Sequence, residues 1–490
     1  MAHEVISGLK PAILWQRFYE IAQVPRPSKK EGKILDHMRK LFKELNISFT
    51  EDKVGNIVAA VPASPGYEKA STVVLQGHVD MVCEKNKETK HDFDNDPISM
   101  IRDNGWIKAK GTTLGSDNGI GVAAALSVIT DKDVIHGPIE ILLTVDEETG
   151  LTGATNLEPG FVSGKILLNM DSEEDGAFYV GCSGGMDTLG SFNIEYENTP
   201  QDAVVYELMV TGLKGGHSGL DIGTGRANGI KILVRTLKQI EKFNYTIAKI
   251  DGGSLRNAIP REAEAILYIK ESDVSAIEKV VNEFQKRAGD EFKTAEGGLK
   301  ILFKKSDEEF EKVFTKNFSV KIINTLLALP HGVIMMSQDI PDLVETSTNL
   351  ATVKINNGKL TVGTSQRSSV ESAKKYIAQS VYSIFTLAGA GIETTDGYPG
   401  WKPNMDSKVL KISKEVFKNI FKKEPEIKAI HAGLECGILE SKNPGMDMIS
   451  FGPTIMGAHS PDERVNIETV ERFYVLLKGI LKELAQQNKN

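Results

Sequence analysis

The first 170 residues alternate short apolar runs with one longer apolar helix pattern. Three continuous β-branched and aliphatic runs are typical of strands buried on both faces of a parallel sheet: 71–80, 139–145 and 165–170. Residues 118–130 (NGIGVAAALSVIT) predict a buried helix, with Asp117 and Asn118 as candidate caps. Strands that alternate with helices indicate an α/β fold, with a mixed, largely parallel central sheet flanked by helices.

A glycine-rich stretch at 181–187 (GCSGGMD) marks a change of pattern. Strand patterns continue beyond it, separated by helix patterns near 227–241, 274–289, 309–327 and 371–387. We therefore expect an inserted α/β domain at 185–392, in a pattern compatible with two similar halves. A second Gly/Thr-rich stretch, 389–401, returns the chain to the first domain. That domain comprises 1–184 and 393–490, and a helix is expected from about Ile467 onward.

Composition and charge limit the possible partners and cellular locations of the protein. The net charge is −8, with 58 Lys and Arg against 66 Asp and Glu, so no global positive field favours a nucleic acid. No apolar run reaches the roughly 20 residues that cross a bilayer. The first 20 residues carry Glu4, Lys10 and Arg17 where a signal peptide needs an apolar core, and the three cysteines form no CxxC pair. We expect a cytoplasmic protein with no membrane partner.

Chemically active side chains follow the predicted strands. His78 and Asp80 end the first run with an i, i+2 spacing that puts both side chains on one face, so that the acid can orient the histidine. Further such side chains stand at strand ends or beside the buried helix: Asp117, Glu147, Glu148, Asp171 and His459. Because open α/β sheets bind ligands at the carboxyl ends of their strands, these groups are expected to meet in one crevice.

The types of side chain in this set favour a metal site. Two histidines and several carboxylates suit zinc, and two ions about 3.5–4 Å apart need a bridging carboxylate. In the Glu147–Glu148 pair, one glutamate can bind metal while the other acts as general base for a water. A single acid at a strand end is more often a solvated turn residue, but five of them in this arrangement favour the metal site.

Several short motifs in a fixed order carry a resemblance over almost the whole chain. They are QVPRPSKKEG, GHVD, GTTLGSDNGIG, TVDEETG, NMDSEEDG, GCSGG, GLKGGHSG, GLDIGTGRANG, HAGLECGI and GAHSPDE. Their number and order make the chain similar to the co-catalytic zinc aminopeptidase, carboxypeptidase and deacylase family. Within it, the chain resembles the aminoacyl-histidine dipeptidases (Xaa-His dipeptidases, peptidase D).

The resemblance implies two zinc ions per chain, with Co²⁺ or Mn²⁺ as substitutes. One ion would have His78 and Asp171 as ligands and the other Glu148 and His459, while Asp117 bridges the two. The sequence keeps every one of these positions. A zinc-peptidase catalytic domain is therefore expected from 1–184 and 393–490.

The resemblance also implies roles around the metals. Asp80 orients a histidine ligand, and Glu147 takes a proton from the attacking water and passes it to the leaving amine. The inserted domain is expected to act as a lid and in dimerisation. Its His217, in GLKGGHSG, would donate to the scissile carbonyl oxygen or its oxyanion; whether it serves its own chain or a partner is open.

The substrate-binding residues are expected in and near the lid. Asn257 is one, and Arg367 is another, as the clamp on the substrate's free carboxylate, because a guanidinium fork matches that planar anion. A surface ion pair is the alternative for Arg367. Glu435 is expected near the entrance, where it would recognise the free amine. The implied substrates are small unblocked dipeptides, Xaa-His peptides such as carnosine first, and the implied assembly is a homodimer.

Other functions are less well supported by the residues. Gly119-Ile120-Gly121 opens a helix as in dinucleotide-binding proteins, but no strand runs directly into these glycines. Gly-His-Ser-Gly at 216–219 lacks the spacing of a serine hydrolase. A metal-binding protein without turnover has no use for Glu147 beside Glu148. Within the family, an acylamino-acid deacylase or a tripeptidase remains the alternative, since metal ligands do not choose the substrate.

Overall fold

The computed structural model describes residues 4–487, which form two compact units. The first unit contains the described residues up to Gly181, 403–429, and those from Leu434 onward, and the second contains Cys182–Lys402 and Ile430–Gly433. The predicted junctions were 184/185 and 392/393. The sequence did not indicate that residues 430–433 join the second unit.

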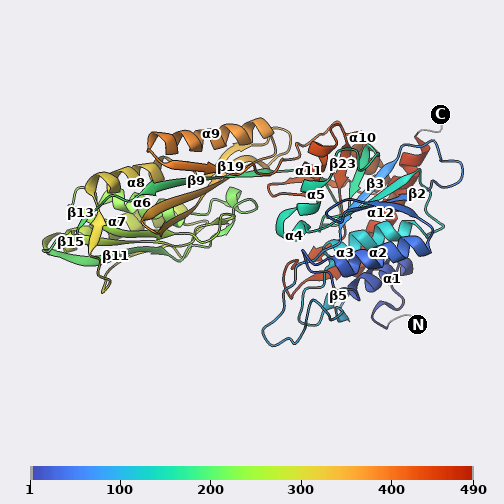
Figure 1. Ribbon diagram of the computed structural model, residues 1–490, viewed down its shortest axis with the longest axis horizontal. Coiled ribbons are helices and arrows are strands. Elements are labelled where there is room, and N and C mark those ends of the chain that lie inside the picture. Colours follow the sequence, from blue (N-terminus) through green and yellow to red (C-terminus); the bar gives the residue numbers. More distant parts are fainter. Residues whose placement is uncertain (1–3, 488–490) are drawn as a thin grey trace. The chain divides into compact units, whose positions relative to one another are not determined.

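The first unit is built on an eight-stranded sheet (Figure 1). Its strand order is β1-β2-β6-β3-β7-β23-β8-β22, and in this order the strands are Ser48–Glu51, Ile57–Val61, Ile139–Thr144, Val73–His78, Ile166–Asn169, Asp447–Ser450, Ala177–Cys182 and Glu426–Ile430. The central strands β6, β3, β7 and β23 are parallel, whereas the outer pairs β1·β2, β2·β6 and β23·β8 are antiparallel. The predicted mixed, largely parallel sheet is confirmed.

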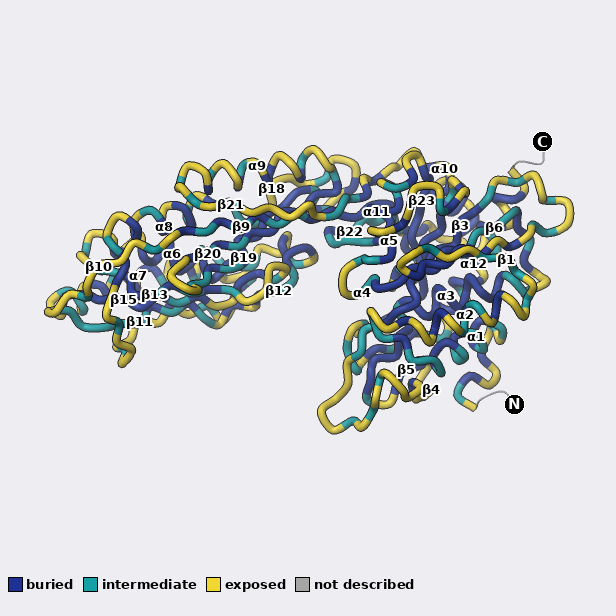
Figure 2. The backbone as a smooth tube through the Cα atoms, in the orientation of Figure 1, coloured by how far each residue is buried: buried dark blue, intermediate teal, exposed yellow. Residues whose placement is uncertain are grey.

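Helices flank this sheet, and its central strands are buried (Figure 2). The helix α3 packs against α1 and β3, and α10 packs against α12 and β23. The helices are α1 (Ala12–Ala22), α2 (Gly32–Glu44), α3 (Ser116–Val128), α4 (Glu147–Gly150), α5 (Thr152–Asn156), α10 (Lys408–Phe421), α11 (Glu435–Lys442) and α12 (Ile467–Gln486), with a 3₁₀ turn η1 (Glu4–Ile6). A small sheet adds β4 (Met100–Asp103), β5 (Trp106–Ala109), β24 (Ile455–Met456) and β25 (Arg464–Asn466).

The second unit has two layers. Its large sheet is antiparallel, in the order β16-β11-β15-β13-β19-β20-β9-β21, and β18 also pairs with β19. These strands are Lys300–Lys305, Ala203–Thr211, Ala263–Lys270, Tyr245–Gly252, Val344–Asn356, Lys359–Ser368, Gly184–Asn193, Gly391–Thr394 and, for β18, Gly332–Met336. Four helices, which contact one another in the order α7-α6-α8-α9, cover the sheet: Val274–Phe292, Gly229–Gln239, Lys316–Ala328 and Glu371–Leu387.

Shorter elements complete the second unit. They are β10 (Tyr196–Asn198), β12 (Gly216–His217), η2 (Ile222–Thr224), β14 (Ala258–Ile259), η3 (Glu271–Asp273) and β17 (Lys312–Phe314). The helix predicted near 309–327 is wrong at its start, because β17 occupies part of that range and the Thr315 hydroxyl caps the helix by accepting from Phe318 N. Of the described helices, none is both long and apolar enough to cross a membrane.

The start of α3 differs from the prediction. Asp117 and Asn118 do not cap the helix; both have non-helical backbone angles, and neither makes a side-chain cap bond. Instead, the buried Glu463 carboxylate accepts from the main-chain N–H groups of Leu114 (2.7 Å), Gly115 (2.9 Å), Ser116 (2.7 Å) and Asp117 (3.3 Å). A carboxylate 346 residues along the chain therefore satisfies the helix terminus and holds the Asp117 backbone.

We expect Glu463→Gln to loosen this turn, because an amide presents donors to N–H groups that need acceptors. Loss of a buried acceptor costs about 1–3 kcal/mol, so hydrogen exchange at Leu114–Ser116 should speed up about tenfold or more. Exchange measured by mass spectrometry or NMR tests this. The control is Asp462→Asn, at an exposed neighbour whose side chain holds no such bond. Unchanged protection in Glu463→Gln would contradict the clamp.

Candidate metal centre

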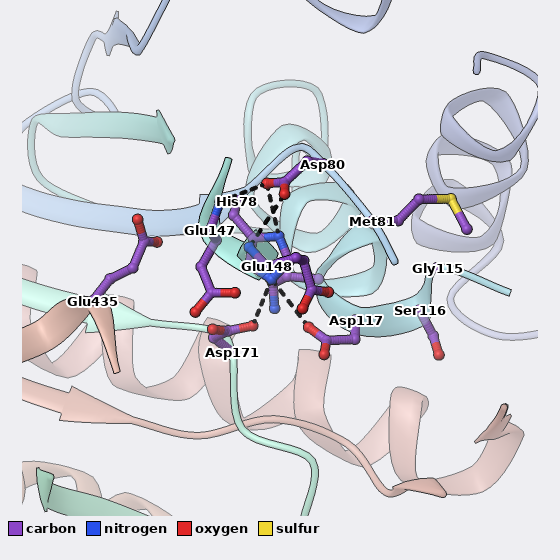
Figure 3. A network of polar contacts seen from close by, with 12 residues as sticks. His78, Asp80, Met81, Gly115, Ser116, Asp117, Glu147, Glu148, Asp171 and Glu435 are labelled. Atoms are coloured by element: carbon purple, nitrogen blue, oxygen red, sulfur yellow. Dashed lines mark hydrogen bonds and ion pairs between the residues drawn. The ribbon is translucent and has the colours of Figure 1, made fainter. Parts of the chain in front are cut away.

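His78 lies at the carboxyl end of β3, buried, at the centre of the first unit's polar network (Figure 3). Its Nε2 is 3.0 Å from Asp117 Oδ1 and 3.3 Å from Asp171 Oδ1. On the other side of the ring, Nδ1 is 3.4 Å from Asp80 Oδ1. The parallel strands β3 and β7 bring these side chains together, since Asp171 follows β7 as Asp80 follows β3.

Asp80 connects the histidine to the acidic turn after β6. Its carboxylate accepts from Glu147 N at 3.1 Å, Glu148 N at 3.3 Å and Ser28 Oγ at 2.8 Å. Burial would raise the pKa of Asp80, but His78 and these hydrogen bonds lower it to about 2. The carboxylate is therefore ionised over the whole neutral range, and it can fix the orientation of the imidazole.

His459, on the loop between β24 and β25, completes a second group. Its Nε2 is 3.2 Å from Asp117 Oδ2 and 3.0 Å from Glu148 Oε2. The side chains of His78, Asp117 and Asp171 offer ligand atoms within 4.8 Å of one another, and so do those of Asp117, Glu148 and His459. The two groups share Asp117, one oxygen facing each histidine.

The donor set of these groups fits divalent cations. Three carboxylates meet only two imidazoles, and the buried Glu148 Oε1 has no hydrogen-bond donor. An unsatisfied buried carboxylate oxygen is costly, and a cation would satisfy it. Mixed imidazole nitrogen and carboxylate oxygen is the set that zinc and similar ions take.

Glu147 lies next to this cluster rather than between the histidines. One of its oxygens is within 4.8 Å of ligand atoms of His78 and Glu148. Burial raises the pKa of Glu147 well above its usual range, His78 opposes this, and Asp171 and Glu435 add to it. Positive charge at the two groups would lower that pKa again, so the proton affinity of Glu147 responds to whatever cation binds there.

Two residues outside the predicted set hold this site together. Glu463 clamps the Asp117 turn, and Arg26, buried, donates from Nη1 to Val79 O (3.0 Å) and Asp80 O (2.6 Å) and from Nη2 to Gly115 O. Gly115 has φ 70°, and a Cβ there would lie 2.4 Å from Arg26 Nη2, so only glycine fits. The motifs QVPRPSKKEG and GAHSPDE contained these two residues, but nothing in their spacing identified the partners.

Glu435 is not where we expected it. The prediction of a carboxylate near an entrance is wrong, because Glu435 is fully buried at the start of α11. It accepts from Gln76 Nε2 at 2.5 Å and Thr144 Oγ1 at 2.7 Å. Burial, the largest cause, raises the pKa of Glu435 to about 7. The apolar sequence around α11 was the signal for burial that the interpretation missed.

The other predicted residues lie in the second unit. His217, on β12, accepts at Nδ1 from Gly219 N (3.3 Å) and Leu220 N (3.1 Å), which leaves the proton on Nε2. Burial and the Arg367 charge lower the pKa of His217, against Asp221, so the neutral ring with an Nε2–H donor is favoured. Asn257 is exposed, and its main-chain carbonyl accepts from the main-chain N–H of Ser218, which is next to His217 in the sequence.

Comparisons with known proteins show the family of this chain. Residues 74–483 match the model of Peptidase family M20/M25/M40. The chain is 41% identical to the cytosol non-specific dipeptidase of Escherichia coli K12 over 98% of this chain and 99% of that protein. It is also 41% identical to the solved aminoacylhistidine dipeptidase of Vibrio alginolyticus, with a TM-score of 0.91 and 98% of each chain covered.

A more distant structure shows the fold alone. The aminopeptidase PepT of Bacillus cereus ATCC 10987 superposes with a TM-score of 0.57 at 16% identity, over 98% of this chain and 100% of that one. The resemblance inferred from the motifs is confirmed, and the fold, the metal-ligand groups and the extent of the family match point the same way. The chain belongs to Peptidase family M20/M25/M40.

Proposed function

We propose that this chain is a dizinc metallopeptidase that hydrolyses unblocked dipeptides, with Xaa-His peptides such as carnosine as the first candidates. The single observation that carries the proposal is the pair of ligand groups that share Asp117. Support for the substrate class comes from two relatives, each 41% identical over nearly the full chain and each named a dipeptidase.

In this proposal the two ions are zinc, with Co²⁺ or Mn²⁺ as substitutes. His78 and Asp171 hold one ion, Glu148 and His459 hold the other, and Asp117 bridges them. Two divalent ions there would supply the positive charge that polarises the scissile carbonyl and makes a water more acidic. The buried His78 and the acids around it supply a setting of low polarity in which that charge acts strongly, whereas His459 lies at the exposed side of the site.

Glu147 is the general base of the proposed reaction. Its main chain is tied to Asp80, which also faces His78 Nδ1, so one carboxylate positions both the base and a ligand. Glu147 takes a proton from the water that attacks the peptide carbon, and it returns that proton to the leaving amine as the C–N bond breaks. His217, with its Nε2–H, donates to the carbonyl oxygen on which negative charge develops.

The second unit provides substrate recognition in the proposal. Arg367 pairs with the free carboxylate of the dipeptide, and Asn257 adds a hydrogen-bonding side chain near His217. We propose further that the protein works in the cytoplasm as a homodimer, in which the second unit also carries the dimer contact. The location is supported by the cytosol dipeptidase relative and by cysteines that form no disulfide among the described residues.

The metal content can be tested directly. We expect the purified chain to bind two zinc ions, and Asp117→Ala to lose most of both, because the bridging carboxylate contributes to each group. Plasma emission spectrometry measures the stoichiometry, and chelation should abolish hydrolysis. Asp103→Ala, at an exposed acid outside the cluster, is the control. Two ions retained by Asp117→Ala would refute the bridge.

The role of Glu147 separates chemistry from metal binding. Glu147→Gln should keep both ions and lower kcat by about 10²- to 10⁴-fold, the usual contribution of a general base, with a smaller change in KM. Steady-state kinetics and metal analysis on the same preparation give both numbers. Glu158→Gln, at an exposed glutamate, serves as the matched control. Full activity of Glu147→Gln would exclude it as the base.

A substrate panel tests the dipeptidase assignment against its alternatives. The panel contains dipeptides with and without a C-terminal histidine, an N-acetylated amino acid, a tripeptide and a C-amidated dipeptide. We expect unblocked dipeptides to have the highest kcat/KM, because a site built to pair a carboxylate rejects a ligand that lacks it. Preferred cleavage of the acetylated compound would favour a deacylase, and preferred cleavage of the tripeptide a tripeptidase.

A further inference from the structure

The second unit contains a buried guanidinium that meets no carboxylate. Arg367, near the end of β20, is 7% exposed. Its Nη1 donates to Tyr398 Oη at 2.9 Å, and its Nε contacts Ser218 Oγ at 3.4 Å. No ion pair joins it to an Asp or Glu within residues 4–487. Several of its five N–H groups are therefore available to a planar anion.

Tyr398 brings a second polar group to the same point. Its phenol oxygen accepts from Arg367, and within the described part of the chain its own O–H proton has no acceptor. Burial raises the pKa of Tyr398, with Arg367 opposing, so the phenol remains protonated at neutral pH. Next to the guanidinium there is consequently a neutral O–H donor.

The fold fixes the position of this hydroxyl. The main chain of Tyr398 pairs with Gly185, with Tyr398 N donating at 2.9 Å and Gly185 N at 3.1 Å, and Lys374 Nζ donates to Tyr398 O at 2.6 Å. A Cβ on Gly185 would lie 2.8 Å from Tyr398 Oη, and a Cβ on Gly433 would lie 2.9 Å from Cε2 and 3.3 Å from Oη. Both glycines must lack side chains to admit the hydroxyl end of the ring.

These glycines come from motifs that the metal chemistry does not explain. Gly185 belongs to GCSGG and Gly433 to HAGLECG, and Gly433 lies in the short segment Ile430–Gly433 that joins the second unit. Gly185 and Gly433, which come from two separate segments of the chain, thus leave a slot for the Tyr398 ring, whose hydroxyl reaches the Arg367 guanidinium. Such a slot fixes the position of the hydroxyl, as a residue that binds a ligand requires.

We propose that Tyr398 is a substrate-binding residue that acts with Arg367. Its oxygen holds Nη1 of the guanidinium, and its O–H donates to the free carboxylate that the guanidinium pairs with. This inference rests on the proposed dipeptidase function, because the carboxylate is that of the dipeptide. The selectivity for an unblocked carboxyl end then comes from two donors, one charged and one neutral.

Binding without turnover tests the inference. In full-length zinc-loaded Glu147→Gln protein, calorimetry measures the Kd of glycylglycine and of glycylglycinamide. Adding Tyr398→Phe should weaken glycylglycine about tenfold or more, as expected for a lost hydrogen bond to a charged group, and weaken the amide by a clearly smaller factor. Tyr376→Phe, at a tyrosine that is 68% exposed on α9, should change neither.

A second variant displaces the Tyr398 hydroxyl without removing it. Gly433→Ala should displace the end of the ring and reproduce the selective loss, and adding it to Tyr398→Phe should weaken glycylglycine little further. Gly289→Ala, on α7 with open space around its Cβ position, is the matched control.

Each outcome bears on one of the two proposals. Equal affinities for glycylglycine with and without Tyr398→Phe, or an equal loss for both ligands, would overturn the binding role. The dipeptidase function is measured separately, as hydrolysis of dipeptides with and without a C-terminal histidine, glycylglycine included, by the unsubstituted chain. A selective Tyr398 effect in a chain that hydrolyses no dipeptide would contradict that function and still support the carboxylate site.

Discussion

The burial of negative charge at the ends of parallel strands is the constraint on which the first unit depends. A carboxylate out of water must be paired, hydrogen-bonded or neutralised by a proton, or it destabilises the fold. Asp80 meets this requirement with two main-chain N–H groups, a serine and His78, and Glu463 meets it with four N–H groups at the start of α3. These two acids are satisfied within the protein.

The acids that face the two histidines differ from Asp80 and Glu463 in how their oxygens are satisfied. Asp117, Asp171 and Glu148 share two imidazoles, and one buried oxygen of Glu148 has no donor. The supporting acids are thus fully bonded, while among the acids that offer ligand atoms Glu148 keeps a buried oxygen without a donor. Glu463 holds the main chain of Asp117, the residue that the two groups share, and Arg26 holds the carbonyl of Gly115 two residues before it.

In the second unit it is a buried positive charge, not a negative one, that lacks a charged partner. Arg367 is a buried cation with only neutral partners, and the nearby His431 adds no charge, because burial and then Arg367 lower its pKa to about 3. A hydrogen bond between His431 Nε2 and Ser347 Oγ, 2.7 Å long, holds that ring. One unit is therefore suited to cations, and the other is suited to an anion such as a carboxylate.

The sequence by itself determined the α/β class, the buried strands and the family. It also indicated the five residues that form the two ligand groups. His78, Glu148 and Asp171 follow from local features: continuous apolar runs, and polar side chains at or close after their ends, which parallel pairing brings to one edge. Asp117, at the start of α3, and His459, on the loop between β24 and β25, do not follow a parallel strand directly, and their place in the set rested on the motifs. The tertiary structure alone decided what depends on distant segments. Glu463 lies 346 residues from Asp117, Glu435 is buried against Gln76 and Thr144, and Gly433 meets Tyr398. Spacing along a chain carries no information about such contacts, because they arise only when separate strands and loops are packed together.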